Sequence, residues 1–428
     1  MPTTAPQTPE TGGLGSLGSL GLMLPTMPQG SAASPCRRAH AGPPDLPTGS
    51  LDPSEPGAPS TTWATGTGLP SAAALAAAAA GAEAAGAAGV WACDHLFWHT
   101  PVVECLTALA IAAAATERCA VGSSVLQLPL RDATVVAKQA SSLQQLSAGR
   151  AVLGLGVGSH PGEYAAAGHD FAARGRRLDD QVAELRRLWA ADPVPDGPSL
   201  DDSDRGRYRQ RPAGEGPPIW FGGSSTAALE RTARQGDGWM PLFLDPDQYT
   251  ATRADLARRC ETVGRDPDGV VPALVVFVSL AAGGADGEDE AMARGTGWMS
   301  SLYRLPPRAF ARHLVAGTAR RCAERLAQWF AAGAAHVVIF VTDDEPLVQF
   351  SDLSTALSGV LGADRMPGPT PTPPPRGTLS LSTAPPSDST RRRAASATEP
   401  TVRAPADRTD LAATPGPSPS EAAGGRSW

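Results

Sequence analysis

Short apolar runs alternate with stretches of helical periodicity along most of the chain. In these runs the apolar residues are continuous rather than alternating with polar ones, which is typical of parallel strands buried on both faces. Between the runs, apolar side chains recur at helical spacing, as at Leu178, Val182, Leu185 and Trp189. The predicted strands are 19–24, 89–93, 120–126, 151–156, 217–221, 238–242, 272–280 and 334–341.

The order of strand and helix repeats about eight times, which predicts an α/β fold of the (β/α)₈ barrel type over residues 19–365. An open, doubly wound parallel sheet is the structural alternative. Three segments rich in Pro, Gly, Ser and Thr interrupt the pattern or follow it. We expect disordered tails at 1–18 and 366–428, and a long low-complexity insertion at 28–68 after the first strand.

Composition excludes several classes of function. A net charge of −7 gives no electrostatic footprint for nucleic acid. The six cysteines form no C-x-x-C pair, so neither a structural metal site nor a disulfide framework is predicted. The longest apolar stretch, 71–89, is mostly Ala and Gly and contains Glu83, so it reads as a helix rather than a membrane span. No signal peptide is evident. We expect a cytoplasmic protein that binds neither membranes nor nucleic acid.

Polar and Gly-rich residues follow the predicted strands, where a (β/α)₈ barrel carries its active site. The sharpest feature is Asp94-His95, directly after the second strand. A histidine held beside a carboxylate can exchange a proton near neutral pH, and oxidation of an alcohol by hydride transfer requires loss of its hydroxyl proton. On the dipeptide alone, a histidine with a purely structural role is an equally good interpretation.

Two further loops lie at the same end of the predicted barrel. Gly222-Gly223-Ser224-Ser225 joins a strand to a helix, and backbone N–H groups of such a turn can bind an anion. The alternative is an ordinary tight turn with Ser224 or Ser225 as helix cap. After the fourth strand, His160 and Glu163 face either substrate or solvent.

Several phrases of the sequence resemble the luciferase-like monooxygenase superfamily, and specifically its coenzyme F-420 (deazaflavin) dependent branch. Their order and number support the resemblance more than any single phrase does. They lie at 90–96 (VWACDHL), 112–131, 136–150, 152–164 (VLGLGVGSHPGEY), 174–180, 217–225 (PPIWFGGSS) and 236–241. With the first strand and the last βα unit, the resemblance covers about 19–27 and 69–362.

The resemblance implies the same barrel with a deazaflavin or flavin ring in its mouth. The cofactor phosphate would lie against Gly222, Gly223 and Ser224, and Gly158-Ser159 would line the cofactor. Ser124-Val125, which reads as plain strand from composition, matches a non-prolyl cis peptide behind the ring in relatives. Asp94 and His95 match the Asp-His pair of the deazaflavin branch, where the histidine lies near ring and substrate.

We therefore predict an oxidoreductase that transfers hydride between F-420 and a small organic substrate, with His95 as proton acceptor or donor and Asp94 beside it. One alternative is an FMN-dependent monooxygenase that uses O₂ and reduced flavin from a separate reductase. A second is a non-catalytic flavin-binding protein. The Asp94-His95 pair favours the first prediction. A homodimer is compatible with the sequence, which leaves the substrate open.

Overall fold

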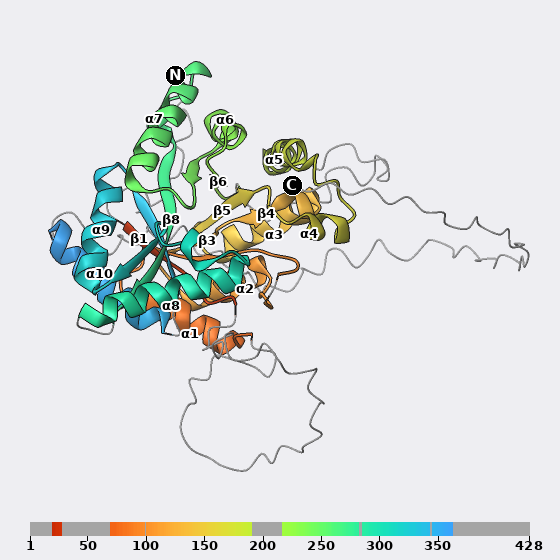
Figure 1. Cartoon of the computed structure of the whole chain (residues 1–428). Helices are drawn as coiled ribbons and strands as arrows, with labels where there is room; N and C mark the ends of the chain where they lie inside the picture. Colours follow the sequence, from red (N-terminus) through yellow and green to blue (C-terminus); the bar gives the residue numbers. More distant parts are fainter. Residues whose placement is uncertain are drawn as a thin grey trace, which may run out of the picture. The chain divides into compact units, whose positions relative to one another are not determined.

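The computed structural model describes residues 19–27, 69–98, 100–190, 216–281, 285–342 and 345–362 (Figure 1). The segments expected to be disordered or low in complexity, 1–18, 28–68 and 366–428, lie outside the described residues. The strands are β1 Ser19–Met23, β2 Gly89–Ala92, β3 Ala120–Ser123, β4 Leu126–Gln127, β5 Ala151–Gly156, β6 Ile219–Gly222, β7 Gly238–Met240, β8 Val271–Leu280, β9 Leu314–Gly317 and β10 His336–Val341. The helices are α1 Ala72–Ala84, α2 Cys105–Ala115, α3 Ala133–Leu146, α4 Pro161–Ala166, α5 Arg174–Ala190, α6 Thr226–Gln235, α7 Pro246–Thr262, α8 Ala285–Tyr303, α9 Ala319–Ala331 and α10 Pro346–Leu361, with single 3₁₀ turns at Leu128–Leu130, Pro267–Gly269 and Pro307–Ala309.

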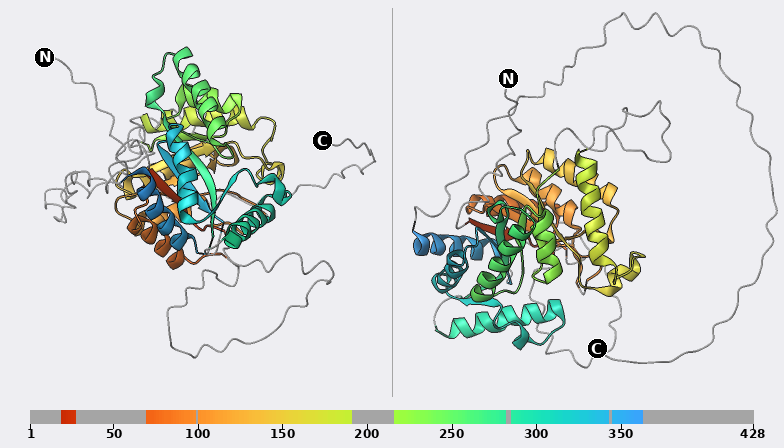
Figure 2. Two further views of the ribbon diagram at one scale, coloured as in Figure 1. Left: turned by 60° about the vertical axis from the view of Figure 1, so that its left-hand side comes forward. Right: turned by 90° about the horizontal axis from the view of Figure 1, so that it is seen from above.

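The strands form a closed parallel barrel. Their order runs β10-β1-β2-β3-β5-β6-β7-β8, and β10 pairs again with β8, which closes the ring. β3 and β4 share one position, because both pair with β5. Helices surround the strands in both views of Figure 2. The predicted (β/α)₈ barrel is thus confirmed, and the open doubly wound sheet is wrong.

Buried apolar residues form two layers, as a parallel barrel requires. The outer layer lies between strands and helices and contains the helical stripe at Leu178, Val182, Leu185 and Trp189. The inner layer fills the barrel with large side chains. Because each strand contributes side chains to both layers, its apolar residues are continuous, which is the pattern visible in the sequence.

Trp91 fills the interior of the barrel because its neighbours on adjacent strands are glycines. A Cβ on Gly122 would lie 2.3 Å from the Trp91 ring, and one on Gly21 would lie 2.5 Å from Trp91 Nε1. Trp91 packs against Trp220 with ring centroids 5.2 Å apart. Its Nε1–H donates a hydrogen bond to Nε2 of the buried His336 over 3.1 Å. Small residues beside one large residue thus give the close packing of a barrel core.

Local signals set several helix boundaries. Helix α7 begins with a capping box between Asp245 and Gln248, and α9 begins at Thr318, whose side chain accepts the N–H of Arg321. After α9, Gly333 adopts a φ of +90°.

Strand β9 and helix α8 were not predicted. Among the described strands β9 pairs with β8 alone and lies outside the closed ring, so it needs no run that is apolar on both faces.

Residues 71–89 confirm the prediction of an Ala-rich helix. Helix α1 begins after Ser71, whose hydroxyl accepts the N–H of Ala74. Of the helices in the described ranges, none is long and apolar enough to cross a membrane.

Candidate active site

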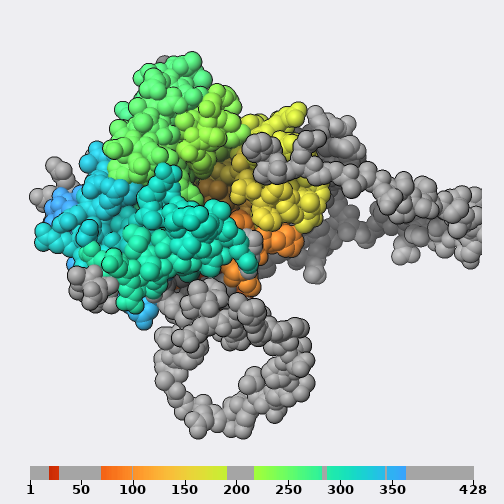
Figure 3. Space-filling view, viewed as in Figure 1, coloured from red at the N-terminus to blue at the C-terminus, as the bar shows by residue number. Residues whose placement is uncertain are grey.

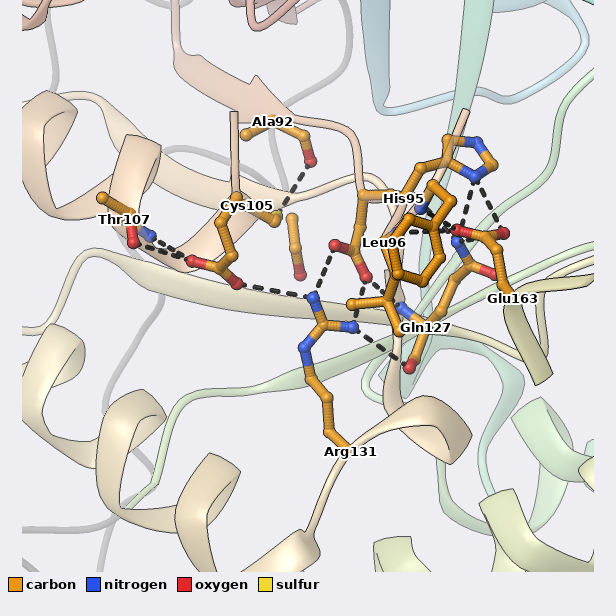
Figure 4. Close-up of polar contacts among 12 residues, drawn as sticks. Ala92, His95, Leu96, Cys105, Thr107, Gln127, Arg131 and Glu163 are labelled. Carbon is orange, nitrogen blue, oxygen red and sulfur yellow. Dashed lines mark hydrogen bonds and ion pairs between the residues drawn. The ribbon is translucent and has the colours of Figure 1, made fainter. Parts of the chain in front are cut away.

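The candidate site residues gather at the carboxyl ends of β2, β4, β5 and β6, the end at which (β/α)₈ barrels carry their chemistry. Figure 3 shows the surface hollowed between α8 (teal), the green segment with α6 and α7, and the yellow segment with α4 and α5. The polar contacts of the site are drawn in Figure 4.

His95 is held by the carboxylate of Glu163. Its Nδ1 lies 3.1 Å from Glu163 Oε2, and the two side chains come from the loop after β2 and from α4 (Figure 4). Glu163 is fully buried, and its Oε1 accepts the backbone N–H groups of Leu96 and Phe97 over 2.6 and 3.1 Å. Glu163 therefore fixes the backbone of the loop as well as the imidazole. It faces neither solvent nor open substrate space.

These contacts define the tautomer of His95. Burial raises the pKa of Glu163, but hydrogen bonds from His95 and from the N–H groups of Phe97 and Leu96 lower it more, so the net pKa is below its usual value. An ionised carboxylate only accepts hydrogen bonds, so His95 Nδ1 carries the proton. Nε2 is then the basic atom. The ring of Trp98 stacks on the imidazole with centroids 3.9 Å apart and holds its plane.

The carboxylate of Asp94 is directed to Arg131 instead of His95. Both Asp94 oxygens accept guanidinium N–H groups over 2.7 Å, and Oδ2 also accepts the N–H of Gln127 over 2.8 Å. Burial raises the pKa of Asp94, and the charge of Arg131 opposes that rise. Asp94 therefore anchors the start of the loop that carries His95. The sequence predicted a carboxylate beside this histidine, and in the structure that carboxylate belongs to Glu163.

Gln127, at the end of β4, joins these groups. Its Nε2 donates to the carbonyl oxygen of Asp94 over 2.8 Å and lies 3.2 Å from His95 Nδ1. Two N–H donors cannot bond each other, so the hydrogen bonds of Gln127 Nε2 go to the carbonyl of Asp94 and, over 3.4 Å, to Glu163 Oε2. The Gln127 Oε1 atom is buried and has no hydrogen-bond partner among the described residues. A Cβ on Gly158, whose φ is +69°, would lie 1.9 Å from that oxygen. The Gln127 Oε1 atom is thus an unused hydrogen-bond acceptor beside the Gly158-Ser159 loop.

The peptide bond between Ser124 and Val125 is cis, as the resemblance implies. The Val125 side chain lies between two bare strand ends. A Cβ on Gly156 would lie 2.5 Å from Val125 Cγ2, and one on Gly222 would lie 3.0 Å from Val125 Cγ1. Glycines on β5 and β6 therefore let Val125 pack directly against both strands, which a side chain at either position would disturb. We call Val125, Gly156 and Gly222 the glycine cradle.

The turn after β6 has the conformation that its glycines allow. Gly223 adopts a φ of +93°, and Trp239 Nε1–H donates to its carbonyl over 2.9 Å. Ser225, and not Ser224, is the helix cap: its hydroxyl accepts the N–H of Ala228 at the start of α6. Ser224 is exposed at the turn, as is Ser159 after β5. Their roles in binding a cofactor stay predictions.

Three residues of the site were not singled out from the sequence: Trp98, Gln127 and Arg131. A signal for two of them was present. Gln127 and Arg131 follow the third predicted strand at the active end, as Asp94 and His95 follow the second. For Trp98, its spacing from His95 carries no such signal, because the stacking arises from the path of the loop.

A closed (β/α)₈ barrel with a histidine–carboxylate pair and a glycine turn at the carboxyl ends of its strands has the architecture of an α/β-barrel enzyme. A family model described as luciferase-like monooxygenase matches residues 48–336. The chain belongs to this family.

Two curated relatives are mycobacterial. An uncharacterised protein of Mycobacterium tuberculosis is 32% identical over 206 residues, which are 48% of this chain and 69% of that protein. A phthiodiolone/phenolphthiodiolone dimycocerosates ketoreductase of Mycobacterium sp. (strain JLS) is 31% identical over 185 residues, which are 41% of this chain and 47% of the ketoreductase. The match thus spans about half the length of the ketoreductase.

Solved structures share the fold. An F420-dependent secondary alcohol dehydrogenase in complex with an F420-acetone adduct has a TM-score of 0.57 at 18% identity, covering 67% of this chain and 94% of that one. The oxygenating constituent of 3,6-diketocamphane monooxygenase from Pseudomonas putida, in complex with FMN, has a TM-score of 0.55 at 15% identity, covering 70% and 95%. At these identities the likeness concerns the fold alone.

Proposed function

We propose that this chain transfers hydride between coenzyme F-420 and a small organic alcohol or ketone, with His95 exchanging the proton. The observation that carries the proposal is the pair of His95 and Glu163 at the barrel mouth. The pair is built for proton exchange, because one ring nitrogen is fixed by a buried carboxylate and the other is left basic. A monooxygenase depends mainly on a pocket that excludes water. The acid–base pair is less important for that reaction.

Each side chain then has a defined task. In alcohol oxidation, His95 Nε2 accepts the hydroxyl proton while the carbinol C–H bond breaks and its hydrogen leaves with both electrons as hydride. When bound, the deazaflavin supplies the two-electron acceptor, or in the opposite direction the donor. Glu163 stabilises the imidazolium that forms, since it already accepts the Nδ1–H. In ketone reduction, the imidazolium returns the proton to the carbonyl oxygen. Asp94 acts as a positioning residue through its pair with Arg131.

The residues present fit a flat ring followed by a phosphate. The glycine cradle carries no side chain on Gly156 or Gly222 at the place proposed for the ring, and the buried Gln127 Oε1 offers an unused acceptor to an N–H group of such a ring. The turn at Gly222-Gly223-Ser224, at the start of α6, would hold the phosphate. These features suit F-420 and FMN alike, so they support a deazaflavin or flavin site without choosing between the two.

Separate titrations of the purified full-length protein with F-420 and FMN test the choice of cofactor, using the change in visible absorbance on binding. We expect F-420 to bind more tightly than FMN. Tight FMN binding without F-420 affinity would overturn the proposal in favour of the monooxygenase, which draws reduced flavin from a separate reductase. Binding without turnover on a panel of alcohols and ketones would favour a flavin-binding protein.

A variant locates the binding site. Gly156→Ala places a methyl group 2.5 Å from Val125 and should weaken cofactor binding about tenfold or more, because the clash displaces Val125 from its position behind the proposed ring site. Gly297→Ala is the matched control, since a Cβ on this α8 glycine meets nothing within 4 Å. Equal affinity of both variants for the cofactor would place the ring elsewhere.

A further inference from the structure

Beside His95, three aromatic side chains form what we call the aromatic wall: Trp98, Phe243 and Tyr303. We propose that this wall binds the apolar part of the substrate, so that the substrate is an uncharged alcohol or ketone bearing an aromatic or hydrocarbon group. The reaction named here rests on the proposed function. The preference for an apolar, uncharged ligand rests on the wall itself.

The wall is continuous with the acid–base pair. Trp98 stacks on His95 at 3.9 Å, Tyr303 meets Trp98 edge-on at 6.3 Å, and Phe243 meets Tyr303 edge-on at 5.6 Å between ring centroids. The three rings come from the loop after β2, the loop after β7 and the end of α8, and each keeps part of its surface accessible. A substrate whose oxygen reaches His95 Nε2 therefore has aromatic surface directly beside it.

The wall is rigid, because a second layer of aromatic side chains supports it. Phe243 stacks on the buried Phe277 at 5.7 Å, and Tyr303 packs on the buried Phe310 at 5.5 Å. Phe243 also adopts a φ of +62°, a conformation that costs a non-glycine residue of order 1 kcal/mol. The surrounding packing must hold Phe243 in this conformation. A rigid apolar surface loses little entropy when it binds a ligand.

Two titratable groups beside the wall, His313 and Cys93, are uncharged at neutral pH, and the rings of His95 and His160 lie 3.9 and 5.9 Å from Trp98. His313 lies 5.2 Å from Phe243, and burial together with the charge of Arg312 lowers its pKa. Burial raises the pKa of the Cys93 thiol to about 11. Arg312 itself is exposed, and its Nε–H donates to His313 Nε2. A charged substrate group beside His313 and Cys93 would lose its hydration without gaining a charged partner from either of them.

A homologous series of probes tests the wall without any turnover. Acetophenone, propiophenone and butyrophenone are dialysed to equilibrium against the full chain, with 4-acetylbenzoate as the charged match. Saturating F-420 or FMN, whichever binds, is present so that the ketones cannot occupy the glycine cradle. We expect each added methylene to tighten binding about fourfold, as its transfer out of water implies. We expect 4-acetylbenzoate to bind at least about tenfold more weakly than acetophenone.

Variants place this binding at the wall. Phe243→Ala and Tyr303→Ala each remove one ring of the wall, and the two residues lie on different elements. If one variant fails to fold, the other still tests the wall. Each should weaken ketone binding about tenfold while cofactor affinity is unchanged. Val348→Ala, on an exposed side chain of α10, is the control and should bind as the wild type does. The inference is wrong if 4-acetylbenzoate binds as tightly as acetophenone, or if a folded wall variant keeps wild-type affinity. Failure of F-420 binding would instead refute the proposed function and leave this result intact.

Discussion

His336 gives the barrel a specific sensitivity to acid, which replacement by glutamine should remove. The imidazole is fully buried at the start of β10. Its Nε2 accepts the N–H of Trp91, so Nδ1 carries the ring proton and donates to Ser19 Oγ over 2.8 Å; the Ser19 hydroxyl in turn donates to the carbonyl of Ala335. A second ring proton would point at the Trp91 N–H. Burial lowers the pKa of His336 to about 3.

The sign and size of the effect follow from this pKa. The ordinary pKa of 6.5 describes the unfolded chain, so between pH 6.5 and about 3 the unfolded state binds one more proton than the folded state. The contribution of His336 to stability is therefore complete above pH 6.5 and is lost progressively as the pH falls toward 3. At about 1.4 kcal/mol per pH unit, the full loss is about 5 kcal/mol, of which about 2 kcal/mol falls between pH 7 and pH 5.

Urea unfolding of the wild type and of His336→Gln at pH 7 and pH 5 measures this term. Glutamine can accept the Trp91 N–H and donate to Ser19, but it does not titrate. The wild type should lose about 2 kcal/mol more than the variant between the two pH values, and the other titrating groups cancel in the difference. An equal loss in both proteins would show that His336 is not buried as a neutral acceptor.

Two substitutions test the packing and the loop anchor, each by urea unfolding. Gly122→Ala should destabilise the fold by about 1–3 kcal/mol, because its methyl group would lie 2.3 Å from the buried ring of Trp91. The control Gly297→Ala should be neutral or stabilising by up to about 1 kcal/mol. Equal stabilities of the two variants would contradict the packing around Trp91. Arg131→Met should lower the free energy of unfolding by about 3–5 kcal/mol, because it leaves the Asp94 carboxylate unpaired. Adding Asp94→Asn to this variant should restore part of the lost stability. A loss below about 1 kcal/mol would mean that the ion pair does not hold the loop.

The barrel was predictable because its strands leave a strong signal. Parallel strands between two apolar layers must be apolar throughout, and the predicted runs overlap every strand of the ring. Strand β9 was missed because four residues that pair with one neighbour require no such pattern. Helix α8 was missed because its position depends on packing against β8 and β9, and its own sequence shows no clear apolar stripe.

The site was predictable in its location but not in its contacts. The sequence indicated the strand ends that carry His95, Gly158 and Gly222, since those positions follow from the barrel. The partner of His95 was not predictable from adjacency, because Glu163 lies 68 residues further along, on α4 after β5, and reaches His95 because β2 and β5 both flank β3 in the barrel. The adjacent Asp94 is held by its two hydrogen bonds from Arg131, which lies after β4, so adjacency did not reveal this partner either.

The most direct test of the account is the rate of hydride transfer in single turnover with bound F-420, followed by its visible absorbance, in the wild type, His95→Ala and Glu163→Gln. We predict that both variants bind F-420 as the wild type does. His95→Ala should transfer hydride about 100-fold or more slowly, and the rate of Glu163→Gln should lie between those of His95→Ala and the wild type, because the imidazolium loses its stabilising carboxylate. Wild-type rates in His95→Ala, with F-420 bound, would contradict it.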